Sequence, residues 1–385
     1  MTDALLLEIA AQHGTPTYVY DLEAITEGVA ALRAAFPDAL IRYAVKANAN
    51  GALLRHLVTA GLGAEALTLG ELERSLRAGF EPAQILFGGP GHTPELARRA
   101  AGAGVGLVSL DSVGAWDVWQ GVSAPETRFL VRLNPGFDPH THEHLATAAA
   151  SSKFGEPHAV ARALGQKIAA TGRLAGFHVH AGSMISDPQV ADLVVAALET
   201  LYEEFPGLEL VDFGGGFAVP NPPLERFSQA YGRFAAKHSV SVVLEPGRFL
   251  VADAGTLLTR VLHVKESERR HIVVDGGMAD LLRPALYGAE HPIRLVGGNG
   301  IPLERLPTDV DGPLCENADR LGQDVELPAV KPGDLLAVGR AGAYGFAMAS
   351  NYVSSLRPAE VAVEAGEIRL VRRREQPADL WRLEV

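Results

Sequence analysis

The sequence contains a single cysteine, Cys315, and has no long apolar run. One cysteine cannot form an intrachain disulfide or a cysteine-cluster metal site, so Cys315 is a packed thiol, an intermolecular partner or a reactive group. No apolar run reaches the roughly 18 residues that a transmembrane helix needs. The stretch from Met1 to His13 carries acidic residues where a secretory signal begins with basic ones. We therefore expect a cytoplasmic protein that does not enter a membrane.

Positive charge is also scarce, with 34 Lys and Arg against 46 Asp and Glu and a formal net charge of -12. Nucleic acid and anionic lipid are bound by Lys and Arg that neutralise phosphates, so neither is an expected partner. A small-molecule ligand fits better. A chain of 385 residues with 47% hydrophobic and 21% charged residues has the composition of a globular protein with two domains.

Short β-rich runs alternate with amphipathic helical stretches over the first two thirds of the chain, a pattern typical of a parallel sheet with crossover helices. The strand candidates are Ile41–Val45, Ala64–Leu67, Gln84–Phe87, Val105–Ser109, Arg128–Leu133, Ala175–His180, Glu209–Phe213 and Ser241–Glu245. About eight such strands predict a TIM-type (β/α)8 barrel over residues 21–255. The carboxyl ends of its strands would form the active-site face.

Beyond this region the helical period fades and short β-rich runs follow one another. They are Leu257–Val264, His271–Val274, Leu335–Val338, Glu360–Val363 and Ile368–Val371. We expect a C-terminal β-sandwich or β-barrel domain over residues 256–385. Residues 1–20 contain a further strand, Thr15–Tyr20, which we expect to join that second domain.

Lys46 lies at the end of an apolar strand, in the run Tyr43-Ala-Val-Lys46-Ala-Asn48. Loss of hydration there favours the neutral amine, which can condense with an aldehyde. The position therefore suits a Schiff-base lysine. A lysine whose stem packs while its ammonium reaches solvent would fit the same run.

Two further strand ends carry groups that can bind an anion. The run Phe213-Gly214-Gly215-Gly216-Phe217 would let backbone N–H groups converge on a phosphate, or would simply form a tight turn. It lacks the residues of a P-loop and the spacing of a dinucleotide fingerprint. In Glu245-Pro-Gly-Arg248 the carboxylate could hold a protonated ring nitrogen and the guanidinium a phosphate, unless the two form a surface ion pair.

Histidine and cysteine supply the remaining candidates. His178 and His180 lie on one face of a strand, but no third ligand stands at metal-binding spacing, so we expect no metal. His180 could stack on a cofactor ring, and His178 is interpreted as a core residue. In Cys315-Glu316-Asn-Ala-Asp319 the thiol is either inert or, beside a carboxylate in an exposed loop, a proton donor.

In this order, these segments resemble the fold-type III pyridoxal 5′-phosphate (PLP) enzymes, the family of diaminopimelate, ornithine and arginine decarboxylases. The similarity to diaminopimelate decarboxylases is carried by Asn134-Pro-Gly136, Ser152-Lys-Phe-Gly155, Asp275-Gly-Gly-Met278, Arg283-Pro-Ala-Leu-Tyr287-Gly and Gly342-Ala-Tyr344-Gly. The resemblance implies PLP as the cofactor. It also implies a carboxy-lyase that converts meso-2,6-diaminopimelate to L-lysine and CO₂.

The resemblance further implies a role for each candidate around the cofactor. Lys46 would hold PLP as a Schiff base, His180 would stack on its ring, and Glu245 would keep the ring nitrogen protonated so that the ring accepts the electrons left by CO₂. The other cofactor-binding residues that it implies are Ser183, Gly215, Gly216, Gly247, Arg248 and Tyr344.

The same resemblance implies how the substrate is held and protonated. Cys315 would return a proton to the carbanion, and the substrate would be bound by Arg248, Arg283, Tyr287, Glu316 and Tyr344. Glu316 suits a distal ammonium and Arg283 a distal carboxylate. Because diaminopimelate carries both groups and ornithine only the amine, diaminopimelate is favoured.

A homodimer with shared active sites is also implied, in which the Cys315 loop of each subunit completes its neighbour's barrel. Lys153 and Asp319 match positions that pair between subunits in this family. The chain departs from the family at Glu65 and Thr68, where Asp and Ser are common, and at Asn317 and Ala318 in the Cys315 loop. These changes concern the shape of the pocket and the hydrogen bonding beneath the cofactor.

Three alternative functions remain open. One is a decarboxylase for another amino acid, such as a D-amino acid, a carboxylated polyamine precursor, ornithine or arginine. Another is a PLP-binding protein without strong catalysis, although proteins of that kind lack the β domain. The third is an alanine racemase, which has a similar layout but uses a tyrosine as its second acid/base and an arginine opposite the ring nitrogen.

Overall fold

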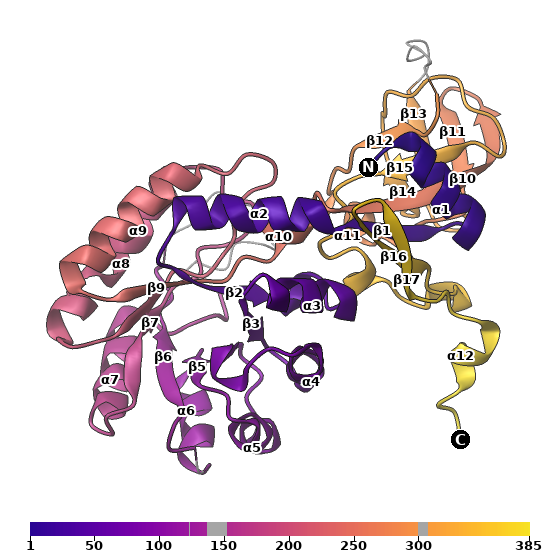
Figure 1. Ribbon diagram of the computed structural model, residues 1–385. Coiled ribbons are helices and arrows are strands. Elements are labelled where there is room, and N and C mark those ends of the chain that lie inside the picture. The colour runs from indigo at the N-terminus through magenta and orange to yellow at the C-terminus, as the bar shows by residue number, and fades with distance from the viewer. Residues whose placement is uncertain (123, 137–151, 299–306) are drawn as a thin grey trace. The chain divides into compact units, whose positions relative to one another are not determined.

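The computed structural model describes residues 1–122, 124–136, 152–298 and 307–385. The chain divides into two compact units (Figure 1). Glu27–Phe249 forms the barrel unit, and Met1–Thr26 together with Leu250–Val385 forms the sheet unit. Within the described residues, no helix is both long enough and apolar enough to cross a membrane.

The barrel unit is a closed ring of eight parallel strands in sequence order. They are β2 (Leu40–Ala44), β3 (Gly63–Ala66), β4 (Ile85–Phe87), β5 (Leu107–Leu110), β6 (Arg128–Arg132), β7 (Leu174–His178), β8 (Leu210–Asp212) and β9 (Ser241–Leu244). Each predicted strand is confirmed to within two residues. The prediction succeeds because strands buried on both faces are continuous apolar runs.

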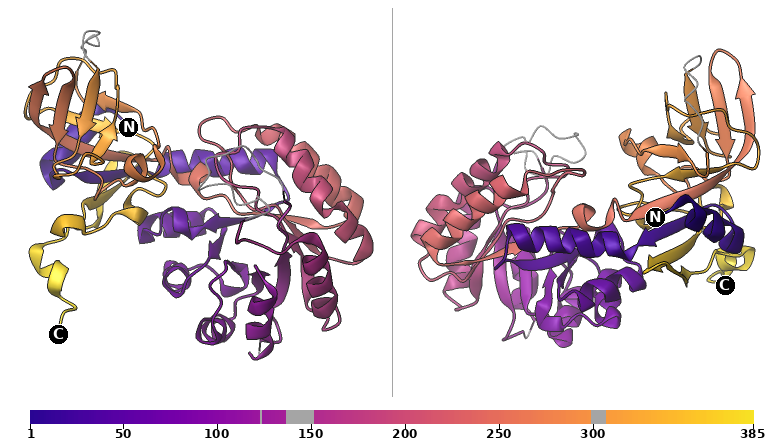
Figure 2. Two further views of the ribbon diagram at one scale, coloured as in Figure 1. Left: turned by 180° about the vertical axis from the view of Figure 1, so that it is seen from behind. Right: turned by 45° about the horizontal axis from the view of Figure 1, so that its top comes forward.

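Helices surround this ring on its outer side (Figure 2). They are α2 (Leu22–Ala35), α3 (Gly51–Thr59), α4 (Leu69–Ala78), α5 (Pro94–Ala103), α6 (Val113–Gln120), α7 (His158–Ala169), α8 (Gln189–Glu204) and α9 (Leu224–His238), followed by the short α10 (Arg248–Val251). Thr68 caps α4 by accepting the Glu71 N–H, so threonine provides the N-cap oxygen that a serine would provide there.

The barrel interior is a packed core below the strand ends. Apolar side chains from five strands meet in one cluster, which consists of Leu86, Leu107, Leu130, Ala175 and Val243. Such a plug of side chains leaves only the carboxyl ends of the strands open for a ligand.

In its described residues the sheet unit contains nine strands, seven of them in the order β14-β13-β11-β10-β1-β16-β17. Their bounds, with those of β12 and β15, are β1 (Thr17–Asp21), β10 (Gly255–Glu266), β11 (Arg270–Val274), β12 (Ile293–Leu295), β13 (Thr308–Asp311), β14 (Arg320–Gly322), β15 (Leu335–Val338), β16 (Ala359–Glu364) and β17 (Glu367–Arg372). The long β10 is shared, because its first half pairs with β1 and β15 and its second half with β11.

The N-terminal segment is part of this sheet. β1 lies between β10, to which it is antiparallel, and β16, to which it is parallel. Leu6 and Ile9 of α1 (Asp3–His13) pack against the sheet core that Val19, Leu258 and Val361 help to form.

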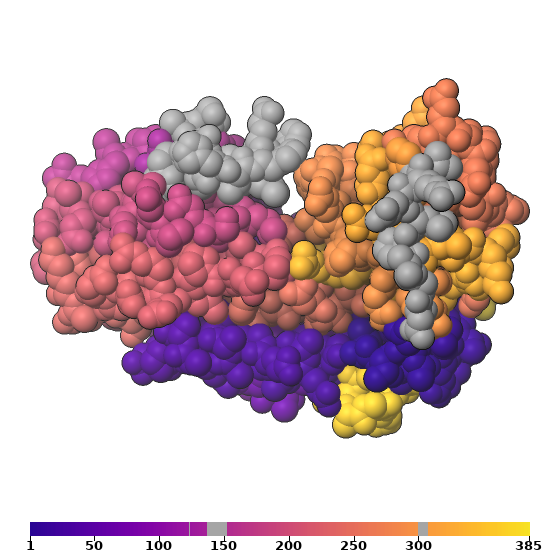
Figure 3. All heavy atoms as spheres, turned by 90° about the horizontal axis from the view of Figure 1, so that it is seen from above, coloured from indigo at the N-terminus to yellow at the C-terminus, as the bar shows by residue number. Residues whose placement is uncertain are grey.

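The sheet unit also includes the short helices α11 (Arg283–Tyr287) and α12 (Pro377–Trp381). The last residues, yellow in Figure 3, lie at the surface, where Trp381 is 53% exposed.

Candidate active site

A cavity of about 180 Å³ lies at the carboxyl ends of the barrel strands. Its lining consists of Lys46, Glu65, Leu67, Gly88, Gly89, Pro90, Ser109, Arg132, Phe154, His178, His180 and Glu245. The structure thus brings together three residues that the sequence singled out, Lys46, His180 and Glu245, although they follow different strands. Strand-end placement is what a barrel active site requires.

Lys46 sits in a single turn of 3₁₀ helix, Val45–Ala47, directly after β2. Its Nζ lies 2.9 Å from Oε2 of Glu65, whose side chain is 3% exposed, whereas the Lys46 side chain is 34% exposed. A buried carboxylate at this distance favours the charged amine. The longer glutamate, found where the family commonly has aspartate, is therefore accommodated as the direct partner of Lys46.

The glycine turn after β8 is built for close approach of the backbone. Gly216 has φ +88°, and a Cβ there would lie 2.2 Å from the carbonyl oxygen of Gly182. A Cβ on Gly215 would lie 2.2 Å from the carbonyl oxygen of Glu245. No larger residue fits either position without movement of the backbone.

The same turn fixes the orientation of His180. The backbone N–H of Gly215 donates to Nδ1 of His180 at 3.2 Å, so Nδ1 is an acceptor and the ring proton belongs on Nε2. Burial lowers the pKa of His180 well below its usual value, and Arg132 and Lys46 lower it further. His180 is therefore a neutral ring held in one orientation.

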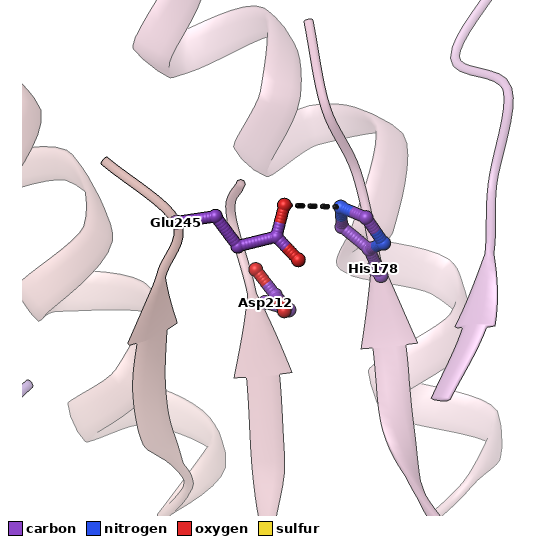
Figure 4. Close-up of side chains that lie close together, drawn as sticks. All are labelled: His178, Asp212 and Glu245. Atoms are coloured by element: carbon purple, nitrogen blue, oxygen red, sulfur yellow. Dashed lines mark ion pairs between the residues drawn. The ribbon is translucent and has the colours of Figure 1, made fainter. Parts of the chain in front are cut away.

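His178, Asp212 and Glu245 form a buried cluster at the ends of β7, β8 and β9 (Figure 4). In Figure 4 the carboxyl group of Glu245 and the imidazole of His178 point toward each other, with Nε2 3.7 Å from Oε2. Nδ1 of His178 lies 2.7 Å from the hydroxyl of Ser109. His178 is 4% exposed, as expected for a core residue, and it also lines the cavity.

Burial raises the pKa of both carboxyl groups of this cluster. Burial raises the pKa of Asp212 to about 7. Burial, reinforced by the charge of Asp212, raises the pKa of Glu245 well above its usual value. Two adjacent buried carboxylates cannot both ionise readily, which favours the state in which one of the two is protonated. Burial also lowers the pKa of His178, which is therefore neutral.

The cluster also tests two expectations from the sequence. Glu245 is 5% exposed and faces His178 and Asp212, so the reading of Glu245 and Arg248 as a surface ion pair is wrong. The ligand atoms of His178, Asp212 and Glu245 lie within 4.8 Å of one another, a donor set that could also serve a divalent cation. Sequence spacing could not indicate this set, because Asp212 and Glu245 follow strands other than that of His178.

Arg248 and Ser183 meet near the glycine turn. Nη2 of Arg248 donates to the Ser183 hydroxyl at 3.2 Å, and Arg248 is 9% exposed. Gly247 lies against the strand end that carries Lys46, since a Cβ there would be 3.1 Å from the Cβ atoms of Ala44 and Ala47. A buried guanidinium beside a hydroxyl is a suitable site for a phosphate.

The polar residues that sequence reasoning missed include Ser109 and Arg132 in the cavity wall and Asp111, which contacts Arg132. Nη1 of Arg132 lies 3.1 Å from Oδ1 of Asp111, and both side chains are largely buried. Asp111 also accepts the Gly155 N–H at 3.0 Å, which ties the Ser152–Gly155 run to the barrel. All three lie at or just past the ends of predicted strands, so the strand-end rule applied to every strand would have found them.

In the sheet unit, Cys315 is exposed, in the loop between β13 and β14, as expected. Asp319 holds this loop from within. It is 2% exposed, and its carboxylate accepts the N–H groups of Met278 and Leu314, each at 2.6 Å. Lys153, in the barrel unit, is exposed. Pairing of Lys153 with Asp319 between subunits stays a prediction.

The remaining predicted residues also belong to the sheet unit. Arg283 and Tyr287 begin and end α11, and Nη1 of Arg283 lies 3.4 Å from Nε2 of His291. Tyr344 adopts a positive φ of 58° in the loop after β15. A cavity of about 740 Å³ lies between α11 and the chain after Glu316, with Asn317 and Ala318 in its wall.

Residues 22–252 match the family described as pyridoxal-dependent decarboxylase, pyridoxal binding domain. The whole chain is similar to diaminopimelate decarboxylases. That of Deinococcus radiodurans is 40% identical, with 99% of this chain and 98% of that protein covered. That of Zymomonas mobilis is 36% identical, with 99% and 95% covered.

Solved structures agree with the sequence comparison. The Helicobacter pylori diaminopimelate decarboxylase complexed with L-lysine has a TM-score of 0.91 at 32% identity, covering 98% of this chain and 99% of that one. A lysine/ornithine decarboxylase from Vibrio vulnificus shares the fold, with a TM-score of 0.83 at 23% identity over 94% and 98% of the two chains. This chain belongs to the diaminopimelate decarboxylase family of pyridoxal-dependent decarboxylases, which confirms the resemblance inferred from the motifs.

Proposed function

We propose that this protein decarboxylates meso-2,6-diaminopimelate to L-lysine and CO₂ with PLP as its cofactor. The observation that carries the proposal is similarity to enzymes of that name over 98 to 99% of the chain, through both units. A PLP-binding protein built from the barrel alone would have no counterpart to the sheet unit.

The cavity and the neighbouring strand ends of the barrel support PLP as the cofactor. A glycine turn that admits no Cβ brings backbone N–H groups close, and Arg248 with Ser183 offers a cation and a hydroxyl for the phosphate. Nε2 of His178 is buried without a hydrogen-bond partner among the described residues, so the cavity retains an unused polar atom. Bound PLP supplies a conjugated ring that takes up the electron pair left when CO₂ departs.

Residues of the barrel would hold the cofactor and manage protons around it. Lys46 would attach it, and Glu65, 2.9 Å from Nζ, would accept the proton that the amine must lose before it can act as a nucleophile. His180, neutral and fixed by Gly215, would present its ring face. Glu245, whose pKa is raised by burial and by Asp212, would face the ring nitrogen and keep it protonated.

Residues of the sheet unit would hold the substrate. Arg283 and Tyr287 would bind the distal carboxylate and Glu316 the distal ammonium, with Tyr344 nearby. Cys315, exposed on its loop, would donate a proton to the substrate carbon after CO₂ leaves. We further propose a homodimer in which this loop completes the barrel site of the partner subunit.

The test of function is CO₂ release from PLP-loaded protein incubated separately with meso-diaminopimelate, ornithine, lysine and arginine. We expect meso-diaminopimelate to be used far better than the others. Preferred use of ornithine or arginine would instead favour a decarboxylase for another amino acid.

The variant Arg283→Lys tests whether Arg283 binds the distal carboxylate of the substrate. A guanidinium grips a carboxylate through two hydrogen bonds, which an ammonium cannot reproduce, so kcat/KM for meso-diaminopimelate should fall at least about tenfold with PLP affinity unchanged. Arg294→Lys, at an exposed arginine of the same unit that pairs with Asp3, is the matched control. An unchanged kcat/KM in Arg283→Lys would contradict a distal carboxylate at this position.

A further inference from the structure

Glu316 is not isolated on its loop, because a tyrosine from a distant segment holds it. The Tyr352 hydroxyl donates to Oε2 of Glu316 at 2.7 Å, and the two residues are 36 positions apart. The neighbouring carboxylate raises the pKa of Tyr352, since a phenolate beside it would be repelled. This hydrogen bond is to Oε2, and no hydrogen bond to Oε1 is found among the described residues.

The backbone that presents Tyr352 is strained. Val353 has φ 55° and ψ 31°, and Ser354 has φ 54°. A β-branched residue in this left-handed region is a rare outlier, because its Cβ crowds the backbone. Val353 is also 57% exposed, so burial of its side chain does not offset the strain.

Surrounding contacts hold the strained turn in place from two sides. Nδ2 of Asn351 donates to the carbonyl of Ser355 at 2.9 Å and to Oε2 of Glu375 at 2.6 Å. The Ser355 N–H closes the turn on the carbonyl of Tyr352 at 3.0 Å. Backbone strain that the surroundings maintain is characteristic of functional positions.

Stability does not explain this arrangement. Tyr352 is 48% exposed, and a hydrogen-bonded pair at the surface contributes little to the free energy of unfolding. The strained turn directly follows Tyr352, whose hydroxyl lies 2.7 Å from the Glu316 carboxylate.

We propose that Tyr352 is a positioning residue that orients the Glu316 carboxylate toward the distal ammonium of the substrate. The inference rests on the proposed function for the role of Glu316. Tyr352 itself touches neither the cofactor nor the substrate in this role. Its hydrogen bond limits the side-chain orientations that Glu316 samples before the substrate ammonium binds.

The decisive variant is Tyr352→Phe, which removes only the hydroxyl. We expect KM for meso-diaminopimelate to rise about three- to tenfold, the range that one lost hydrogen bond supports, while kcat changes less than about twofold. PLP affinity and Tm should stay at the values of the unsubstituted protein. A loss of Tm or of PLP affinity that accounts for the kinetic change would overturn the inference.

A double-mutant cycle shows whether Tyr352 acts through Glu316. In a Glu316→Gln background, Tyr352→Phe should raise KM little further, because the carboxylate that it orients is gone. Fully additive effects of the two substitutions would mean that Tyr352 acts elsewhere.

A substrate-free measurement separates failure of this inference from failure of the proposed function. The alkaline absorbance titration of the protein minus that of Tyr352→Phe reports the ionisation of Tyr352, which should shift to lower pH in Glu316→Gln. The pairing is absent if no shift occurs. If the shift occurs but no CO₂ is released from meso-diaminopimelate, the proposed function fails and with it the role in substrate binding. If CO₂ is released and KM is unchanged in Tyr352→Phe, only the inference about Tyr352 fails.

Discussion

Replacing Asp280 by asparagine should stabilise the protein at alkaline pH but much less at acid pH. Asp280 is 7% exposed in the sheet unit, where its Oδ2 accepts the Gly277 N–H at 2.9 Å. Burial raises its pKa from 3.8 to about 7, and the nearby charges of Asp275 and Asp319 add to the effect. The native carboxyl group therefore keeps its proton over a range in which the unfolded chain has lost it.

The sign and size of the effect follow from this difference. Between pH 3.8 and 7 the native state binds more protons than the unfolded state, so stability falls as pH rises, by up to about 1.4 kcal/mol per pH unit. Relative to a pH below 3.8, the protein has lost at most about 1.5 kcal/mol of stability at pH 5 and at most about 4 kcal/mol at pH 8 through this group. Asparagine cannot ionise, and its oxygen can accept the same N–H group. The free energy of unfolding of Asp280→Asn, relative to that of the unsubstituted protein, should therefore increase by about 2.5 kcal/mol between pH 5 and pH 8.

The assay is urea unfolding of both proteins at pH 5 and pH 8, followed by near-ultraviolet circular dichroism. Asp212 also titrates near pH 7, but it is present in both proteins and cancels from the difference. Asp253→Asn, at a 57% exposed side chain of the same unit, is the control, and its effect should not differ between the two pH values. An Asp280→Asn effect that is equal at pH 5 and pH 8, or that destabilises at pH 8, would refute the reasoning.

Three further predictions concern the site. Gly216→Ala places a Cβ 2.2 Å from the Gly182 carbonyl at φ +88°, so PLP affinity measured by fluorescence titration should fall at least about tenfold; full affinity would exclude this turn from the site. Lys46→Ala should abolish the borohydride-reducible link between protein and PLP, and a surviving link would implicate another lysine, such as Lys153. An equal mixture of Lys46→Ala and Cys315→Ala proteins should recover up to about a quarter of full activity, because half of the random dimers carry one intact site of two. No recovery after verified subunit exchange would show that each site is built from one chain.

The barrel could be predicted from the sequence because its signals are local. Parallel strands buried on both faces are apolar over their whole length, and β4, from Ile85 to Phe87, is fully buried. A reactive residue at the end of a strand can be recognised from that short segment alone, so Lys46, His180 and Glu245 could each be selected from its own strand. Their meeting in one cavity then follows from the (β/α)8 architecture.

In the sheet unit the local signals are weaker. β12, β13 and β14 were not predicted, and they are only three or four residues long. β13 pairs in parallel with β11 and antiparallel with β14, so partners elsewhere in the chain determine that it is a strand. Short strands without clear alternation depend on such pairing more than on their own composition.

Sequence alone thus determined the barrel, its active-site face, the family and the principal candidate residues. Tertiary structure alone placed Asp212 and Glu245 beside His178, paired Lys46 with Glu65, and joined Tyr352 to Glu316. The physical reason is that apolar periodicity and turn residues act between neighbours in the chain. Shared protons, ion pairs and oriented carboxylates depend on atoms a few ångströms apart that belong to segments tens of residues apart.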